Sequence, residues 1–271
     1  MRAYVELMKL RVVELLIITT IPAMVLAARG LPSLDLVLAT LIGGTLAAGS
    51  ANAFNMVIEA KTDKLMARTS KRPLVTGSIG KNQALVFASI IGALSLVIFQ
   101  YYTTPLATLL NALAIFYYVV IYTIILKPNT AQNIVWGGAA GCMPVLIGWA
   151  AVTGSLTWVP VAFFMVVFIW TPPHFWALAI KYRSDYSAAG IPMLPSVSSQ
   201  SSVISQMWFH TIAMVIASTA LIQLAKLPVW VLCATVLLGA IFTFQLFALK
   251  ENSGTYDKVA AGIFHWSITY L

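Results

Sequence analysis

Residues 36–73 decide the fold, and they read LVLATLIGGTLAAGSANAFNMVIEAKTDKLMARTSKRP. The first part, residues 36–58, is an apolar run of about the length that an α-helix needs to cross the hydrocarbon of a bilayer, roughly 20 residues. Glu59 and Asp63 follow directly, and a basic segment begins at Lys61. The stretch therefore predicts a transmembrane helix whose acidic end meets a basic loop.

The rest of the chain repeats this apolar pattern. The composition is 60% hydrophobic and 9% charged, which excludes an ordinary soluble globular protein. Further low-charge segments occur at about residues 10–28, 83–101, 105–126, 132–152, 157–180, 203–225, 229–249 and 259–271. We expect an all-α, polytopic membrane helical bundle of nine transmembrane helices, in one integral-membrane domain over residues 1–271. Because the last segment covers only about half a bilayer, we expect the ninth helix to be truncated and the C-terminal end to be missing.

Basic residues predict how the bundle is oriented. If the N-terminus is cytoplasmic, only Arg29 and Lys226 of the 16 lysines and arginines fall in outside loops, and the other fourteen fall in inside segments. Topology then explains the net charge of +8, so we expect no nucleic-acid partner. Cys142 and Cys233 lie in predicted helices far apart in the sequence, so we expect neither a disulfide nor a cysteine metal site.

The acidic end of the quoted helix has the spacing of a cation site. Asn55, Glu59 and Asp63 are four residues apart, so they share one helix face, and Asn52 lies close to it. Two carboxylates at this spacing repel each other unless a cation lies between them, and Mg²⁺ prefers oxygen ligands together with substrate phosphates. The arginines of the basic loop can bind phosphate through two parallel hydrogen bonds. The pattern predicts a Mg²⁺-diphosphate site; the alternative is an ordinary juxtamembrane loop whose acids balance its lysines.

A second acidic cluster follows the sixth apolar segment. We expect a helix break at Pro172-Pro173 and a new helix from Pro173 to Tyr186, which would place His174, Lys181 and Asp185 on one face. The apolar residues 189–195 that follow could form a lid over a cavity or a plain connection. For His174, three roles remain open: a haem or metal ligand, a proton-transfer group, or a structural histidine that hydrogen-bonds to a neighbouring helix.

The two clusters suggest an internal repeat. Asp63 and Asp185 are 122 positions apart (185 minus 63), and each begins a long inside loop, as a four-helix unit repeated once around a central cavity would require. Repeats and polar residues in spans are also found in transporters. A transporter predicts charged groups near the middle of the membrane, whereas these acids lie at one face, which argues against that class.

At these residues the chain resembles the UbiA-type intramembrane prenyltransferases. The family's pattern N-x3-D-x3-D followed by M-x-R-T-x2-R-P corresponds to Asn55, Glu59, Asp63, Met66, Arg68, Thr69, Arg72 and Pro73. Glu59 departs from the usual aspartate, which puts a direct metal contact there in doubt. The segments Pro173-His174-Phe175-Trp176 and Ala189-Gly190-Ile191-Pro192-Met193 are similar to the branch of the family that farnesylates haem, and the resemblance covers nearly the whole chain.

The resemblance implies a nine-helix fold, a bacterial cytoplasmic (inner) membrane location and Mg²⁺-dependent transfer of a farnesyl group from farnesyl diphosphate to a vinyl group of haem B. The implied product is haem O, made for terminal oxidases, which also suggests a haem A synthase or oxidase-assembly partner. A quinone-precursor aromatic acid is the alternative acceptor. The implied roles are metal binding by Asn55, Glu59, Asp63 and Asp185, diphosphate binding by Arg68, Arg72, Lys181 and Lys127, haem binding by His174, and carbocation shielding or core packing by Tyr118 and Tyr122.

Overall fold

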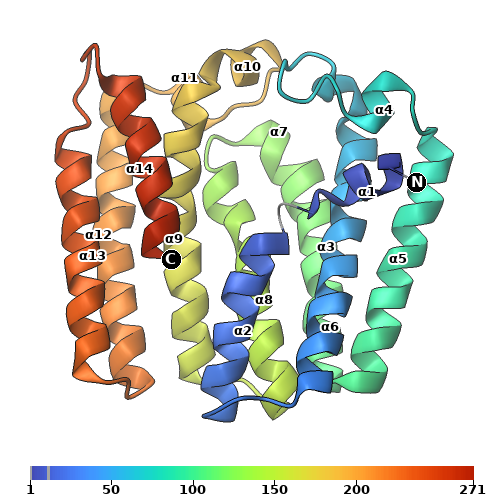
Figure 1. Ribbon diagram of the computed structural model, residues 1–271. Coiled ribbons are helices and arrows are strands. Elements are labelled where there is room, and N and C mark those ends of the chain that lie inside the picture. Colours follow the sequence, from blue (N-terminus) through green and yellow to red (C-terminus); the bar gives the residue numbers. More distant parts are fainter. Residues whose placement is uncertain (1, 11–12) are drawn as a thin grey trace. The chain divides into compact units, whose positions relative to one another are not determined.

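The computed structural model describes residues 2–10 and 13–271, and the elements in these ranges are helices, with no strand among them (Figure 1). Arg11, which contributes to the orientation argument, lies outside the described residues. The elements are α1 (Arg2–Met8), α2 (Val13–Ala28), α3 (Leu34–Asp63), α4 (Pro73–Thr76), α5 (Lys81–Tyr102), α6 (Pro105–Phe116), η2 (Tyr117–Leu126), α7 (Lys127–Asn129), α8 (Asn133–Thr153), α9 (Trp158–Lys181), α10 (Arg183–Ala188), α11 (Leu194–Val197), α12 (Gln200–Leu224), α13 (Val229–Phe247) and α14 (Tyr256–Tyr270).

Seven of the helical segments in the described chain are long and apolar enough to cross a membrane. They are Leu34–Asp63, Lys81–Tyr102, Pro105–Asn129, Asn133–Thr153, Trp158–Lys181, Gln200–Leu224 and Val229–Phe247. A shorter apolar helix over Ile17–Ala28 and the 15-residue α14 lie where the first and ninth spans are predicted. The all-α membrane fold is thus confirmed, while the count of nine crossings and the internal repeat stay predictions.

The chain forms two compact units. The first comprises Met1–Leu126 and Ala140–Pro160, and the second comprises Lys127–Ala139 and Val161–Leu271. In the first unit, α3 packs most extensively on α5, and α1 and α4 lie at the C-terminal end of α3 (Figure 1). The packing of α3 on α5 uses small residues: the Ser95 hydroxyl donates to the Gly43 carbonyl at 2.7 Å, and that of Ser50 to the Ala88 carbonyl at 2.8 Å. Such close approach and polar contact stabilise helix pairs in lipid.

At two glycines of α3, a Cβ atom would crowd a side chain of a neighbouring helix. A Cβ atom on Gly43 would lie 2.7 Å from the Phe99 ring, and one on Gly49 would lie 2.7 Å from Cε of Met8. Gly49 therefore lets the end of α1 lie against α3. This contact matters for the site, because the residue after Met8 is a lysine.

In the second unit, α14 is hydrogen-bonded to both α9 and α12. The Trp170 indole donates to the Ser267 carbonyl at 2.7 Å, and the Tyr270 hydroxyl donates to Ser218 Oγ at 2.9 Å. Asn133, at the start of α8, donates to the carbonyl of Pro192 at 3.3 Å, which anchors the loop between α10 and α11. These contacts use polar groups inside apolar helices, where an unsatisfied group is costly.

The expected break at Pro172-Pro173 is wrong. α9 runs without interruption from Trp158 to Lys181 with both prolines inside it. A break at this depth would expose several backbone groups to lipid, whereas a proline removes only the hydrogen bond of its own nitrogen. The helix ends at Lys181 instead, Tyr182 has φ −107° and ψ 20°, and Asp185 belongs to α10. His174 and Lys181 therefore share a helix, but the expectation that Asp185 continues their face is wrong.

Candidate active site

The C-terminal half of α3 presents a buried polar stripe. Asn52, Asn55, Glu59 and Asp63 are 4%, 2%, 8% and 3% exposed. The helical spacing that predicted a common face for the last three is confirmed by their shared burial in one continuous helix. Buried carboxylates are stable only when they are paired or bind a metal, so the site must contain a cation.

One cation that the structure places beside these carboxylates is the guanidinium of Arg72. Its Nη1 lies 2.6 Å from Oδ2 of Asp63 and 3.9 Å from Oε2 of Glu59, and the Arg72 side chain is 16% exposed. The loop returns to α3 because the Thr69 hydroxyl donates to the Asp63 carbonyl at 2.8 Å. The structure thus brings Glu59, Asp63 and Arg72 together. Arg72, which was predicted to bind diphosphate, contacts the two carboxylates in this structure. Arg68, on the same loop, is exposed.

The carboxylates and Asn55 provide only oxygen donors on this stripe. Among the described residues there is no cluster of three or more histidine, cysteine, aspartate or glutamate side chains that could hold a metal by themselves. A hard cation at this point would therefore combine two carboxylates with an amide oxygen and with ligands from elsewhere. That donor set suits Mg²⁺, which is usually bound by one or two carboxylates together with substrate phosphates.

Two contacts to Asn55 come from residues that sequence reasoning missed as site residues. The Lys9 ammonium donates to Asn55 Oδ1 at 3.0 Å, and Asn55 Nδ2 donates to Thr123 Oγ1 at 3.2 Å. Lys9 was counted only as a topology signal, and nothing in the local sequence distinguishes Thr123. The partners are 46 and 68 positions from Asn55, so only the fold reveals these contacts.

Asn52 links α1 to η2 in the same way. Its Nδ2 donates to the Met8 carbonyl at 3.1 Å, and its Oδ1 accepts from the Tyr118 hydroxyl at 3.3 Å. The Tyr118 and Tyr122 rings are 5.4 Å apart between centroids. Their carbocation-shielding role stays a prediction. The hydrogen bond to Asn52 places the Tyr118 hydroxyl at the polar stripe.

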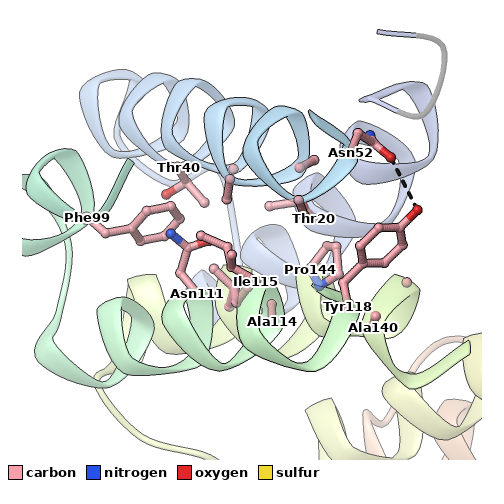
Figure 2. A pocket seen from close by; sticks show the side chains of 16 residues that line it. Thr20, Thr40, Asn52, Phe99, Asn111, Ala114, Ile115, Tyr118, Ala140 and Pro144 are labelled. Carbon is pink, nitrogen blue, oxygen red and sulfur yellow. Dashed lines mark hydrogen bonds between the residues drawn. The ribbon is translucent and has the colours of Figure 1, made fainter. Parts of the chain in front are cut away.

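A cavity of about 130 Å³ lies next to this stripe, within the first unit. Figure 2 shows Asn52 and Tyr118 at one end of it, joined by their hydrogen bond, and Phe99, Asn111 and Thr40 toward the other end. Asn111 is buried and donates to Ser95 Oγ at 2.8 Å, so its amide is partly satisfied within the helices. The remaining lining is apolar or small: Gly44, Ala47, Ala48, Ala51, Ala114, Ile115, Ala140, Gly141, Pro144 and Ile147, with Thr20.

The other predicted site residues belong to the second unit. Lys127 is half-buried on α7, Lys181 is the exposed last residue of α9, with its ammonium 5.6 Å from the centre of the Tyr182 ring, and Asp185 is half-buried on α10. The neighbouring Arg183 donates to Asp257 of α14 at 2.7 Å, and this hydrogen bond raises the pKa of Arg183. A single site containing both acidic clusters stays a prediction.

His174 is enclosed by aromatic rings and bonded to α14. Its ring stacks on Trp170 at 4.2 Å and on Phe264 at 4.7 Å, and its Nδ1 lies 2.6 Å from Ser267 Oγ. The Ser267 hydroxyl donates to the Phe264 carbonyl at 2.6 Å, so it has no proton for His174. Nδ1 must therefore be the donor, and a neutral imidazole then keeps a lone pair on Nε2, the form that can bind a metal. The hydrogen bond to a neighbouring helix agrees with the structural role, and the haem role stays a prediction.

The family described as "UbiA prenyltransferase family" matches residues 16–268. The protoheme IX farnesyltransferase of Renibacterium salmoninarum is 49% identical over 276 residues, covering 100% of this chain and 86% of that protein. The protoheme IX farnesyltransferase of Frankia casuarinae is 50% identical over 272 residues, covering 100% of this chain and 94% of that protein.

Solved structures show the same fold at low identity. A UbiA homologue from Archaeoglobus fulgidus, bound to DMAPP and Mg²⁺, is 16% identical with a TM-score of 0.70, covering 98% of both chains. A digeranylgeranylglyceryl phosphate synthase is 16% identical with a TM-score of 0.77, covering 99% of this chain and 93% of that one. With a family match over nearly its whole length and relatives of about half-identical sequence, the chain belongs to the UbiA prenyltransferase family.

Proposed function

We propose that this chain is a protoheme IX farnesyltransferase, which transfers a farnesyl group from farnesyl diphosphate to a vinyl group of haem B and releases diphosphate. The observation that carries the proposal is the identity of about one half, over the full chain, to relatives with that name. The buried stripe of Asn55, Glu59 and Asp63 beside Arg72 supports the diphosphate half of the reaction.

Mg²⁺ is the cofactor of this proposal, held by oxygens of Asn55, Glu59 and Asp63 and by Asp185 of the second cluster. When bound with the substrate, the ion neutralises charge that develops on the leaving diphosphate. The structure supports such a site through its donor chemistry: the acids are buried, they bear only oxygen atoms, and they already hold one cationic group. The solved homologue bound to DMAPP and Mg²⁺ gives family-level support.

Arg72 exchanges partners in this account. Without substrate its guanidinium compensates Asp63 and Glu59. With the metal-diphosphate in place, the carboxylates no longer need the guanidinium, which is then available to bind phosphate oxygens through two hydrogen bonds. Arg68, Lys127 and Lys181 are the further diphosphate-binding residues of the proposal. Arg72 thus offsets part of the negative charge of Asp63 and Glu59 before substrate binds, and then binds the leaving group.

The apolar cavity behind Asn52 and Tyr118 holds the farnesyl chain. It begins at the polar stripe and is lined mostly by alanine, glycine and isoleucine, so a hydrocarbon chain entering it moves from water onto a mostly apolar surface (Figure 2). Tyr118 presents its ring where the reacting end of the chain would lie. An aromatic face stabilises a nearby cation and does not react with it as water would.

Farnesyl transfer breaks one carbon–oxygen bond and forms one carbon–carbon and one carbon–oxygen bond. The bond between farnesyl C1 and the diphosphate oxygen breaks, and diphosphate leaves with the electron pair. A haem vinyl group donates its π electrons to C1, which forms the new carbon–carbon bond and leaves a positive charge on the other vinyl carbon. Water adds there and loses a proton, giving a hydroxyethylfarnesyl side chain. The apolar lining of the cavity disfavours water near the farnesyl cation before the vinyl group reacts with it.

The cytoplasmic face of the bacterial inner membrane is the proposed place of the site. Thirteen of the fourteen inside-facing basic residues lie in the described ranges, since Arg11 is the exception, and the bias supports this orientation. An interaction with a haem A synthase or an oxidase-assembly protein stays a prediction.

The test compares two prenyl acceptors with the purified protein. Haem B and 4-hydroxybenzoate are each incubated with farnesyl diphosphate and Mg²⁺ in detergent, and diphosphate release and prenylated products are measured. The proposal expects product and stoichiometric diphosphate with haem B only. Product from 4-hydroxybenzoate alone would assign the chain to the quinone-precursor branch instead.

A further inference from the structure

We propose that Thr123 is a positioning residue that fixes the orientation of the Asn55 carboxamide, so that its oxygen rather than its nitrogen serves the cation site. The inference rests on the proposed function in one respect, because it concerns the same Mg²⁺-diphosphate site. It is carried by hydrogen-bond directions that leave one orientation for the amide.

The Thr123 hydroxyl fixes which atom of the Asn55 amide is the donor in the hydrogen bond between them. Thr123 is buried, and its Oγ1 donates to the Tyr118 carbonyl at 2.8 Å. A carbonyl can only accept, so the single hydroxyl proton is used there, and only lone pairs remain on Oγ1. Whichever atom of Asn55 lies 3.2 Å away must therefore be a donor. That atom is Nδ2.

Lys9 independently fixes which atom of the Asn55 amide is the acceptor. The Lys9 ammonium lies 3.0 Å from the other polar atom of the Asn55 amide. An ammonium has three donors and no acceptor, so its partner must be the amide oxygen. Both neighbours thus select the same orientation, with Nδ2 toward η2 and Oδ1 toward a positive charge.

Helix η2 supplies the unusual geometry that makes this possible. A threonine in an α-helix commonly donates to the carbonyl three or four residues earlier. Over Tyr117–Leu126 the chain is a π-helix, and Thr123 donates five residues back, to Tyr118. The Tyr118 hydroxyl in turn donates to Asn52 Oδ1, the contact drawn in Figure 2. Residues of this π-helix therefore hydrogen-bond to two asparagines of α3. The π-helix is rare in proteins, and π-helical turns inside α-helices are often found at functional sites.

Orientation decides what Asn55 can bind. Its oxygen is the only atom of the amide that can be a metal ligand, whereas the NH₂ group would repel a cation. Without the acceptor on Thr123, no group in the described structure holds Nδ2 toward η2, and Lys9 alone selects the orientation of the amide. Groups that orient metal ligands in this way commonly affect metal affinity by about 10–100-fold when they are removed.

The test measures metal binding directly and does not depend on haem. Mn²⁺ is titrated into the detergent-purified protein with inorganic pyrophosphate, and bound ion is followed by electron paramagnetic resonance. Thr123→Val keeps the shape and removes the hydroxyl, so we expect Mn²⁺ affinity to fall by at least about tenfold. Thr123→Ser keeps the hydroxyl and should bind close to wild type. The matched control is Thr211→Val on α12, where a buried hydroxyl has no partner in the described structure.

A double-mutant cycle separates positioning from a general packing effect. If Thr123 acts through Asn55, then Thr123→Val should cause no further loss of Mn²⁺ affinity in an Asn55→Leu background. Wild-type affinity in Thr123→Val, or an equal further loss in the Asn55→Leu background, would overturn the proposal. If Thr123→Val does not fold, Thr123→Ala is measured against Thr123→Ser by the same criteria. Absence of haem farnesylation by the wild type, with these Mn²⁺ results intact, would refute the proposed acceptor and leave the role of Thr123 standing.

Discussion

Replacing Arg72 by alanine should destabilise the protein in a way that Mg²⁺ reverses. The substitution removes a guanidinium 2.6 Å from Asp63 and 3.9 Å from Glu59 and leaves two buried carboxylates on one helix face. Losing one partner of a buried ion pair costs about 3–5 kcal/mol, and we expect the lower end, about 3 kcal/mol, because Arg72 is partly exposed. For a chain of this size, that corresponds to a decrease in Tm of about 6–12 °C.

The assay is thermal unfolding of the purified protein in detergent, with and without Mg²⁺ and pyrophosphate. A divalent ion placed between Glu59 and Asp63 substitutes for the missing guanidinium, so it should restore much of the lost Tm in Arg72→Ala. It should raise the Tm of the wild type less, because there it must first displace the arginine. Arg72→Lys, which keeps a charge, is the matched control and should lose less stability than Arg72→Ala.

Two results would refute this reasoning. An unchanged Tm in Arg72→Ala would show that the acids do not depend on this guanidinium. A lowered Tm that Mg²⁺ does not restore would show that the stripe is a structural ion pair and not a metal site. In the same variant, we expect the apparent affinity for farnesyl diphosphate to fall while haem affinity changes little, because in the proposed function the guanidinium binds the diphosphate and not the haem.

Three further substitutions test other parts of the site. Glu59→Asp should retain activity or alter the preference between Mg²⁺ and Mn²⁺, whereas Glu59→Gln should lower activity by at least about tenfold through loss of a ligand charge; equal, full activity of both in the metal-dependence assay would place Glu59 outside the site. His174→Ala should weaken haem binding in a titration followed by absorbance while farnesyl diphosphate binding is retained, and Ser267→Ala should cause a smaller change of the same kind; an unaltered haem spectrum and affinity in a stable His174→Ala would contradict the haem role. Phe99→Ala should lengthen the cavity, so the ratio of geranylgeranyl to farnesyl transfer should increase. The loss of a buried phenylalanine should lower the stability of the protein by about 3–5 kcal/mol. An unchanged ratio in the product analysis would mean that the far end of the farnesyl group does not lie at Phe99.

Much of the polar stripe could be predicted from the sequence because its signal is local. Spacing of four residues within a long apolar run predicts that Asn55, Glu59 and Asp63 share a helix face, and the structure confirms this. Small residues in an apolar helix also favour close packing, and Gly43 and Gly49 of α3 allow it. Such features follow from helix geometry and residue size, which neighbouring residues determine.

The remaining features depend on contacts between distant parts of the chain. The approach of Lys9 and Thr123 to Asn55 requires α1 and η2 to pack on α3, and no periodic pattern encodes that. The π-helical turn arises within an apolar run that reads as an ordinary span. At Pro172-Pro173 the usual helix-breaking preference of proline loses to the cost of exposing backbone groups in lipid, so local chemistry predicts the wrong outcome. Direct pairing of Arg72 with the acids was not predicted, because sequence reasoning assigned the arginines to diphosphate binding and named only lysines as the partners of the acids in the alternative interpretation.

One measurement tests the central claim most directly: mass spectrometry of the haem after reaction with farnesyl diphosphate and Mg²⁺ in ¹⁸O-labelled water, with Asp63→Asn as the inactive control. The account predicts one new haem species that carries a single farnesyl group and a single ¹⁸O atom, with one diphosphate released for each haem consumed, and none of this product in Asp63→Asn. Unmodified haem from a folded wild-type protein, or the same product from Asp63→Asn, would contradict it.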